Sequence, residues 1–375
     1  MKKILLSLLV FLIILCLINF EQLKVDILTE LVISRGVVSV NCLWYKITEL
    51  FFKDASGINL FNDLKKKYGD FAFTNVFGKD CYLVTNINDI KYVLDNSPYL
   101  FNVGELKLKF FKTFMERNVG VSGGCPWKRR RAINDYALKT DQLHPYYKIY
   151  NNHMFDLLKN TKHKINFKDL VNIGKNNVYK VVFNSTNVHD DVFEIFRQAN
   201  NTKVFYNNDF GVDKKVYNNY KKTLKKFINN PQKESLIELC VKSSDNKDDI
   251  YHQIPHFIFP IFGLFLTTGP RLLILLCNHH NILDRVIEEV NNNEVSNLPY
   301  LRKCIMETVR LNAPVISLFR TLEKDMQLNK RYFKKGTQLL LLTNPILRQN
   351  EHFSDAYKFV PERWNEKLEK EYYAI

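Results

Sequence analysis

The 375-residue sequence lacks the signatures of several common catalytic sites. It contains no glycine-rich phosphate loop, no His-Glu-x-x-His pair and no Gly-x-Ser-x-Gly turn. His279 and His280 are adjacent, so they point to different faces of a helix and make a poor pair of metal ligands. Nucleotide-hydrolysing, zinc-protease and esterase functions therefore lack support.

The sequence also lacks a framework of paired cysteines. Its seven cysteines include no Cys-x-x-Cys pair and none of the dense spacing that crosslinks small secreted domains. We therefore expect reduced and mostly buried thiols. The seven are Cys16, Cys42, Cys81, Cys125, Cys240, Cys277 and Cys304.

Acidic residues are scarce relative to basic ones. Lys and Arg number 54 against 39 Asp and Glu, which gives a formal net charge of +15. A basic surface suits an acidic partner protein, an anionic membrane or nucleic acid, and it is also compatible with a merely solvated face. With 46% hydrophobic residues, the chain can bury a large core in one domain or two.

The N-terminus carries one long apolar run. Ile4 to Phe20 contains no charge and follows Lys2 and Lys3, and its length suits a helix that crosses a bilayer. A cleaved signal peptide is the alternative, but no small-x-small cleavage site precedes Glu21. The sequence predicts a membrane anchor at residues 1–21, whose orientation the flanking charges specify only weakly.

Residues 22–56 are apolar with sparse charges and predict an interfacial or linker segment rather than a second span. Residues 57–375 then predict one catalytic domain, mostly α with small β-sheets. Its first part should form a helix ending at Gly69, a hairpin with a turn at 78–80, and a helix at 87–94.

The remainder of this domain is expected to be largely helical. The middle third has few glycines or prolines, and Ser243 to Asp249 predicts an exposed loop within it. Ile254 to Cys277 is apolar enough for a membrane span, but its prolines and the Gly269-Pro270 pair favour an interrupted, buried core helix. Helices are expected at 282–290 and 298–311, and a strand at 339–342.

Two separated segments carry the most specific pattern in the chain. Glu307 and Arg310 lie three residues apart on one helix face, a spacing that is usually only a surface ion pair. A second arginine, Arg363, follows in the segment Phe-Val-Pro-Glu-Arg-Trp at 359–364. A carboxylate can accept from two guanidinium groups, so these residues can fix two distant segments together.

The pattern resembles the cytochrome P450 superfamily, whose helix K carries Glu-x-x-Arg and whose later Pro-Glu-Arg segment supplies a third member. The resemblance implies that Glu307, Arg310 and Arg363 form a structural triad. Trp127 and Arg131 match the family's Trp-x-x-x-Arg in helix C, which implies that they bind the haem propionates. Arg320 matches the position of a further propionate-binding arginine.

The residue types suit that role, because an indole N–H and a guanidinium group can both donate hydrogen bonds to a carboxylate. The family's helix I is matched by Gly-Leu-Phe-Leu-Thr-Thr at 263–268, which implies that Thr267 assists proton delivery. Leu266 stands where the family places an acidic residue, so a proton relay through Thr267 lacks the ionisable neighbour that it needs.

The resemblance also implies that haem b is bound through a cysteine thiolate, which none of the seven cysteines matches. That axial cysteine is expected beyond Ile375, so no metal ligand is assigned and the P450-like fold is expected to be incomplete at its C-terminus. Cys304 is an alternative ligand, but its place on the helix K segment predicts an inert buried thiol.

Two functional hypotheses follow. The first is a monooxygenase that hydroxylates a small apolar molecule with dioxygen and electrons from NADPH–cytochrome P450 reductase. It would be single-pass in the endoplasmic reticulum membrane, with the domain facing the cytosol and no nucleic-acid partner. The second is a haem-free, membrane-tethered pseudoenzyme or remnant.

Overall fold

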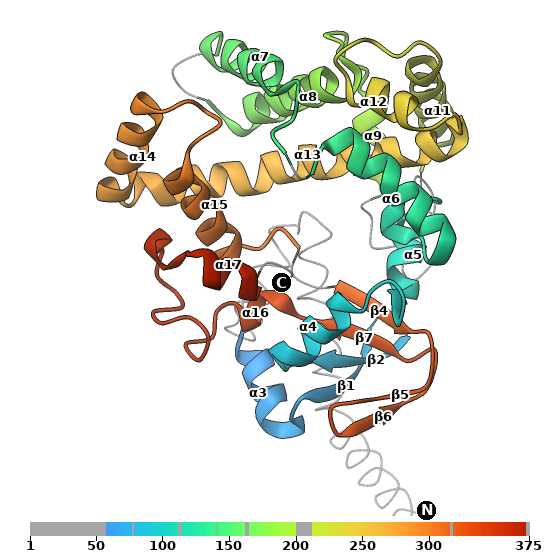
Figure 1. The fold of residues 1–375 in the computed structure, drawn as a ribbon, viewed down its shortest axis with the longest axis vertical. Helices are drawn as coiled ribbons and strands as arrows, with labels where there is room; N and C mark the ends of the chain where they lie inside the picture. The colour runs from blue at the N-terminus through green and yellow to red at the C-terminus, as the bar shows by residue number, and fades with distance from the viewer. Residues whose placement is uncertain are drawn as a thin grey trace, which may run out of the picture. The chain divides into compact units, whose positions relative to one another are not determined.

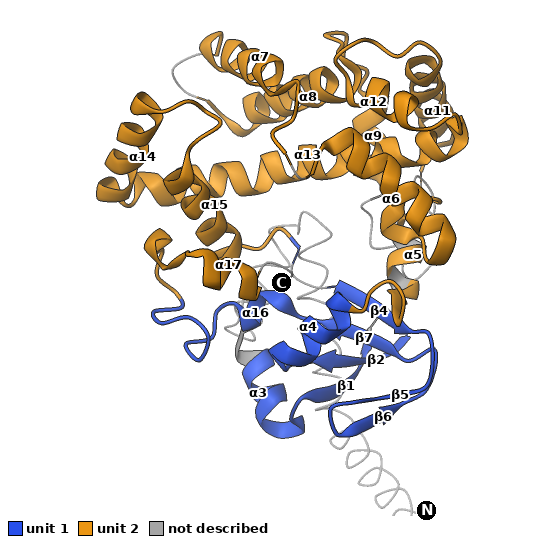
Figure 2. Ribbon diagram, viewed as in Figure 1, with its two compact units in different colours: residues 1–95, 315–356, 375 blue, residues 96–314, 357–374 orange. Residues whose placement is uncertain are grey.

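The computed structural model describes residues 58–76, 79–111, 115–140, 142–161, 165–199, 212–315 and 318–372. The predicted anchor (1–21) and interfacial segment (22–56) lie outside these residues. The chain divides into two compact units, coloured blue and orange in Figure 2. Unit 1 comprises residues 1–95, 315–356 and 375, and unit 2 comprises residues 96–314 and 357–374. The predicted catalytic domain is therefore described as two units.

Unit 1 contains a small mixed sheet. Strands β1 (Phe71–Val76) and β2 (Lys79–Val84) form an antiparallel hairpin, β7 (Gln338–Leu341) pairs parallel with β2, and β4 (Leu318–Leu322) pairs antiparallel with β7. All four residues of β7 are buried. A sheet built this way brings residues near 83 and 340 into register, although they are far apart in the sequence.

Helices and a second hairpin complete unit 1 (Figure 1). Helix α3 (Ile58–Tyr68) is followed by Gly69, whose positive φ of 73° is a left-handed conformation that glycine adopts without strain and that commonly ends helices. The other elements are α4 (Ile87–Asp95), β5 (Met326–Leu328), β6 (Arg331–Phe333) and α16 (Thr343–Ile346).

Unit 2 is almost entirely helical. A large apolar cluster joins α6, α8, α9, α11, α12 and α13, and includes the fully buried Tyr179 and Tyr220. Its elements are β3 (Phe101–Val103), α5 (Glu105–Phe111), η1 (Val119–Val121), α6 (Gly124–Leu138), α7 (Tyr147–Lys159), α8 (Phe167–Phe183), α9 (Asp191–Ala199), α11 (Lys214–Asn229), α12 (Leu236–Ser243), α13 (Lys247–Cys277), α14 (His280–Asn292), α15 (Pro299–Leu311), η2 (Pro361–Arg363) and α17 (Glu366–Tyr372).

The prediction of a mostly helical chain with small sheets is confirmed. The predicted turn at 78–80 is wrong in part, because Lys79 and Asp80 already belong to β2, and residue 78 lies outside the described residues. The predicted loop at 243–249 is also wrong in part. It is shortened to residues 244–246, since α13 begins at Lys247 and Asp249 is only 2% exposed.

Helix α13 differs most from its prediction. Its 31 residues run without interruption through Pro255, Pro260 and Pro270. Each interior proline removes one helical hydrogen bond and crowds the preceding turn, and packing of α13 against its neighbouring helices offsets this cost. Length and composition would allow α13 to cross a membrane, but it packs against α6, α8, α11 and α15 of unit 2. The prediction of a buried core helix at 254–277 is wrong for most of its length, because residues 259–275 are all partly or fully exposed and burial is confined to residues 254, 255, 257, 258 and 276.

Candidate functional site

The carboxylate of Glu307 is the centre of a buried polar cluster in unit 2. Arg310 donates to it twice, from Nε to Oε2 at 2.8 Å and from a terminal nitrogen to Oε1 at 2.8 Å. Arg363 Nε donates to Oε1 at 3.0 Å and Trp364 Nε1 donates to Oε2 at 2.9 Å. The Val360 N–H adds a bond to Oε1 at 3.1 Å. Glu307 and Arg310 are 0% and 1% exposed, so this charge pair is removed from water.

Local structure explains how these groups meet. Glu307 and Arg310 are three apart on α15 and therefore share one face of the helix. The short helix η2 turns the chain so that Arg363 and Trp364 both reach the same carboxylate. Burying a charge pair is unfavourable unless every oxygen is satisfied, and here both oxygens of Glu307 accept several donors. The structure thus brings the three predicted triad residues together and adds Trp364.

A second polar layer lies outside this cluster. Glu362 accepts from Arg285 and, at 2.6 Å, from the Tyr300 hydroxyl, while the Arg285 guanidinium stacks 3.9 Å from the centre of the Tyr300 ring. Burial and the hydrogen bond to Glu362 raise the pKa of the Tyr300 hydroxyl, so it stays protonated as a donor. Glu289 accepts from the backbone N–H groups of residues 300 and 301, which satisfies donors at the start of α15.

The predicted propionate-binding pair lies on α6. Trp127 and Arg131 are four residues apart, so both project from the same side of that helix. The Trp127 ring meets Tyr99 edge to face, with centroids 6.1 Å apart. Arg131 is exposed and pairs with Asp135 at 2.8 Å. An exposed pair of this kind contributes little to stability, so the Arg131 guanidinium is available to another carboxylate.

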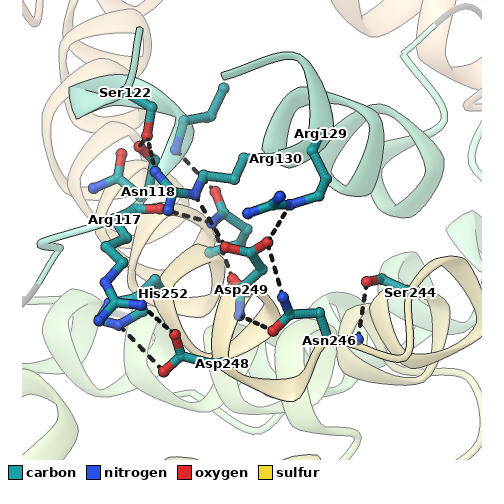
Figure 3. Close-up of polar contacts among 12 residues, drawn as sticks. Arg117, Asn118, Ser122, Arg129, Arg130, Ser244, Asn246, Asp248, Asp249 and His252 are labelled. Carbon is teal, nitrogen blue, oxygen red and sulfur yellow. Dashed lines mark hydrogen bonds and ion pairs between the residues drawn. The ribbon is translucent and has the colours of Figure 1, made fainter. Parts of the chain in front are cut away.

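Two further arginines fasten α6 to the start of α13, as Figure 3 shows around Asp249. Arg129 Nε donates to Oδ2 of Asp249 at 2.5 Å, and Arg130 Nε donates to Oδ1 at 3.1 Å. Arg130 also donates to Ser122 Oγ at 2.6 Å. Burial would raise the pKa of Asp249, but the hydrogen bonds from Arg129 and Arg130 outweigh burial and lower the pKa. Asp249 is therefore ionised at neutral pH.

Gln253, one turn further along α13, continues this network. Its Oε1 accepts from Asn134 Nδ2 at 3.0 Å and from the N–H of Val119 at 2.9 Å, and its Nε2 donates to the carbonyl of Arg117 at 3.2 Å. Gln253 is 0% exposed. Its side chain thus joins α13, α6 and η1 and sets the position of the helix that carries Trp127.

The middle of α13 carries the residues predicted for proton delivery. The Thr267 hydroxyl donates to the carbonyl of Gly263 at 2.8 Å, within its own helix. The buried Oγ1 of Thr268 has no hydrogen-bond partner among the residues that the structure describes. Arg320 lies on β4 of unit 1 and is therefore described separately from the α6 pair. Burial lowers the pKa of the Arg320 guanidinium, which donates to the carbonyl of Phe319 at 2.8 Å.

The described cysteines do not match an exposed thiolate loop. Each lies within a helix or strand: Cys81 in β2, Cys125 in α6, Cys240 in α12, Cys277 in α13 and Cys304 in α15. Burial raises the pKa of the Cys240 and Cys304 thiols to about 12, so both are protonated. The described residues contain no group of three or more His, Cys, Asp or Glu arranged for a metal ion. Trp127 and Arg131 are donors of the kind that can hold the propionate groups of a haem. None of the described cysteines is suited to bind the haem iron.

Sequence reasoning missed Asp249, Gln253 and Trp364. A signal for Asp249 was present, because Asn246 followed by two aspartates is a typical start of a helix. In the structure the Asn246 side chain caps α13 by accepting from the Asp249 N–H at 3.0 Å. Trp364 directly follows Arg363 in the segment that matched the family pattern. No periodicity in the sequence could show that its indole N–H bonds to Glu307.

Comparison with known proteins agrees with this arrangement. A family profile described as cytochrome P450 matches residues 267–375, the segment that contains the Glu307 cluster. The mouse protein 1,25-dihydroxyvitamin D(3) 24-hydroxylase, mitochondrial, is 27% identical over 157 residues, or 39% of this chain and 30% of the relative. Probable cytochrome P450 508D1 of Dictyostelium discoideum is 23% identical over 341 residues, or 76% of this chain and 70% of the relative.

Solved structures show the same fold. A cyanobacterial CYP120A1 with bound retinoic acid superposes with a TM-score of 0.68 at 17% identity, covering 84% of this chain and 78% of that one. A zebrafish cytochrome P450 with abiraterone gives 0.67 at 17% identity, covering 82% of each chain. The chain belongs to the cytochrome P450 superfamily.

Proposed function

We propose that this protein is a haem monooxygenase that hydroxylates a small apolar molecule. Family membership supports the reaction class, and one structural observation carries the haem site: the Trp127 and Arg131 pair on α6, a helix fastened to α13 through Asp249. A bound haem with a thiolate ligand would supply the oxygen-activating chemistry. The axial cysteine in this proposal lies outside the described residues.

The chain's own residues have separate roles in this proposal. Trp127 and Arg131 would hold the propionates of a bound haem through hydrogen bonds, and Arg320 of unit 1 is a separate candidate for the same role. The partly exposed second half of α13 supplies apolar side chains that exclude water from the substrate. The Thr267 hydroxyl would hold a proton for the reaction. The triad of Glu307, Arg310 and Arg363 acts only through the fold.

Membrane attachment and an electron donor are further parts of the proposal. The apolar run at residues 4–20 supports a single anchor in the endoplasmic reticulum, with the domain facing the cytosol. The net charge of +15 supports docking of an acidic partner, for which we propose the NADPH-dependent cytochrome P450 reductase. Exposed α6 residues such as Lys128 and Arg131 contribute to that charge.

A haem-free pseudoenzyme is the second candidate, and two observations favour it. Leu266 replaces the acid that would supply protons to Thr267, and the Cys240 and Cys304 thiols are protonated. Sequencing the transcript past the codon for Ile375, and recording the reduced carbon monoxide difference spectrum of the encoded protein, separates the two. A thiolate-type spectrum supports the monooxygenase. A stop codon directly after Ile375, with no such spectrum, supports the pseudoenzyme.

A further inference from the structure

One face of α13 carries a row of polar side chains directed at α6 and η1. Asp249, Gln253 and His256 are four and three residues apart, so they lie on the same side of the helix. Asp249 and Gln253 are satisfied within the protein, the first by two arginines and the second by Asn134 and the backbone of η1. The third member of the row, His256, is not satisfied in this way.

The His256 ring makes no hydrogen bond to any residue in the described part of the chain. It lies beside Gly120 of η1, where an added Cβ would be 3.5 Å from the His256 Cε1 and 3.7 Å from Nδ1. The side chain is partly exposed rather than sealed in the core. A partly exposed imidazole that bonds to no described residue can exchange hydrogen bonds with a bound ligand.

The charges around His256 indicate what a partner would be. Burial, followed by the positive charges of Lys107 on α5 and Arg131 on α6, lowers the pKa of the imidazole to about 4. At neutral pH the ring is therefore uncharged and has one N–H to donate. Within the described residues, both charged groups that act on the ring are cations. A group that accepts a hydrogen bond and carries negative charge is complementary to this set.

The helix face beyond His256 is only partly covered by the residues that the structure describes. Residues 260, 263 and 267 continue the same face toward Thr267, and no described heavy atom lies within 4 Å of a Cβ built on Gly263. Eleven residues of helix separate His256 from Thr267, which corresponds to about 16 Å. An extended apolar molecule with a polar head would fit along this face between the two side chains.

We propose that His256 is the hydrogen-bond donor of a carboxylate subsite, with Lys107 and Arg131 supplying the positive charge. The carboxylate is that of an extended apolar acid whose chain follows α13 toward Thr267. A haem propionate has the same chemistry and is the second source. The placement of the acid's chain at Thr267 rests on the proposed monooxygenase function, whereas carboxylate binding at His256 does not require it.

The test uses the full chain in lipid nanodiscs without added haem, titrated with dodecanoate or its methyl ester. Wild type should bind dodecanoate more tightly than the ester. His256→Phe should weaken dodecanoate binding about tenfold, as expected for a lost hydrogen bond to a charged group, without changing ester binding. His256→Gln retains a donor and should recover part of the affinity. His252→Phe, one turn earlier on α13, is the control and should bind like wild type.

A second titration, with haemin and haemin dimethyl ester, distinguishes the source. If His256→Phe weakens binding of haemin but not of its ester, and leaves dodecanoate unchanged, the subsite holds a propionate. If the variant binds both acids as wild type does, or if wild type binds neither, the proposal is overturned. Dodecanoate is titrated without haem, so the result tests the carboxylate subsite even if the protein is not a monooxygenase.

Discussion

The indole N–H of Trp364 donates to the carboxylate of Glu307 at 2.9 Å, and both side chains are almost completely buried. The bond connects the segment after η2 to α15 across 57 residues of sequence. It gives Glu307 a donor that is independent of the two arginines. Three side chains and one backbone N–H donate to the carboxylate, so both of its oxygens have hydrogen-bond partners within the protein.

Removing the Glu307 charge should be severely destabilising. Glu307→Gln leaves the guanidinium of Arg310 buried without its counter-charge, so we expect the free energy of unfolding to fall by about 3–5 kcal/mol. Urea denaturation followed by circular dichroism measures the change. Glu362→Gln is the matched control, because its ion pair with Arg285 is solvent-exposed and should contribute only about 0–1 kcal/mol. Equal effects of the two substitutions would contradict the prediction.

Trp364→Phe should remove the indole hydrogen bond together with part of the buried indole ring. An aromatic ring is kept, but one donor to Glu307 and several packed ring atoms are lost, so we expect the free energy of unfolding to fall by at least about 1–3 kcal/mol. Trp127→Phe is the control in the absence of haem, since Trp127 is only partly buried and should cost less than about 0.5 kcal/mol. The same denaturation measurement applies. A loss at position 127 as large as that at 364 would refute the assignment.

Asp249→Asn should destabilise the protein in a pH-dependent way. The folded-state pKa of Asp249 is below its ordinary value, so its charge contributes stability above the unfolded pKa of about 3.9. That contribution is lost as pH falls through the folded pKa. We expect wild type to be more stable than the variant by about 1–3 kcal/mol at pH 7. Thermal melts from pH 7 to pH 3 should show this difference shrinking only below about pH 4.

If the gap between wild type and Asp249→Asn stayed constant down to pH 3, the ionised carboxylate would not be its origin. Asp135→Asn is a suitable control, because Asp135 forms an exposed ion pair with Arg131 four residues earlier on the same helix. Its effect on the melting temperature should be small at every pH.

Gly174→Ala should be destabilising, although alanine favours helices. A Cβ at this position of α8 would lie 2.9 Å from Phe265 Cδ1 and 3.2 Å from Phe262 Cε2, both on α13. Such overpacking typically costs about 1–3 kcal/mol. Gly263→Ala is the control, because its Cβ meets no described atom within 4 Å, and the helix should gain about 0.5–1 kcal/mol. If Gly174→Ala and Gly263→Ala shifted the melting temperature in the same direction, the close approach of α8 to α13 at Gly174 would be disproved.

Arg131→Gln should weaken haem binding without unfolding the chain. Loss of a charged hydrogen bond to a propionate predicts about a tenfold rise in the dissociation constant for haemin. Lys128→Gln removes a charge from the exposed side of the same helix and should leave haemin affinity unchanged. Fluorescence quenching of tryptophan by haemin measures both. If Arg131→Gln bound haemin with unchanged affinity, Arg131 would not be a propionate-binding residue.

Several elements could be predicted from local pattern alone. The predicted helices at 282–290 and 298–311 correspond to α14 and α15, and the hairpin of unit 1 lies where alternating residues indicated it. These features depend on periodicity within one segment. The uninterrupted course of α13 could not be predicted in this way, because its prolines argue for a break and only packing by its neighbours outweighs them.

The chain's sequence by itself determined its family and named Glu307, Arg310, Arg363, Trp127 and Arg131, because short motifs with fixed spacing identify residues that act together. Only the tertiary structure decided that Asp249 is buried between two arginines and that Trp364 donates to Glu307. It also decided that His256 lies beside Gly120 with no hydrogen-bond partner among the described residues. The physical reason is that hydrogen bonds between distant segments depend on how helices pack, and packing has no local periodicity.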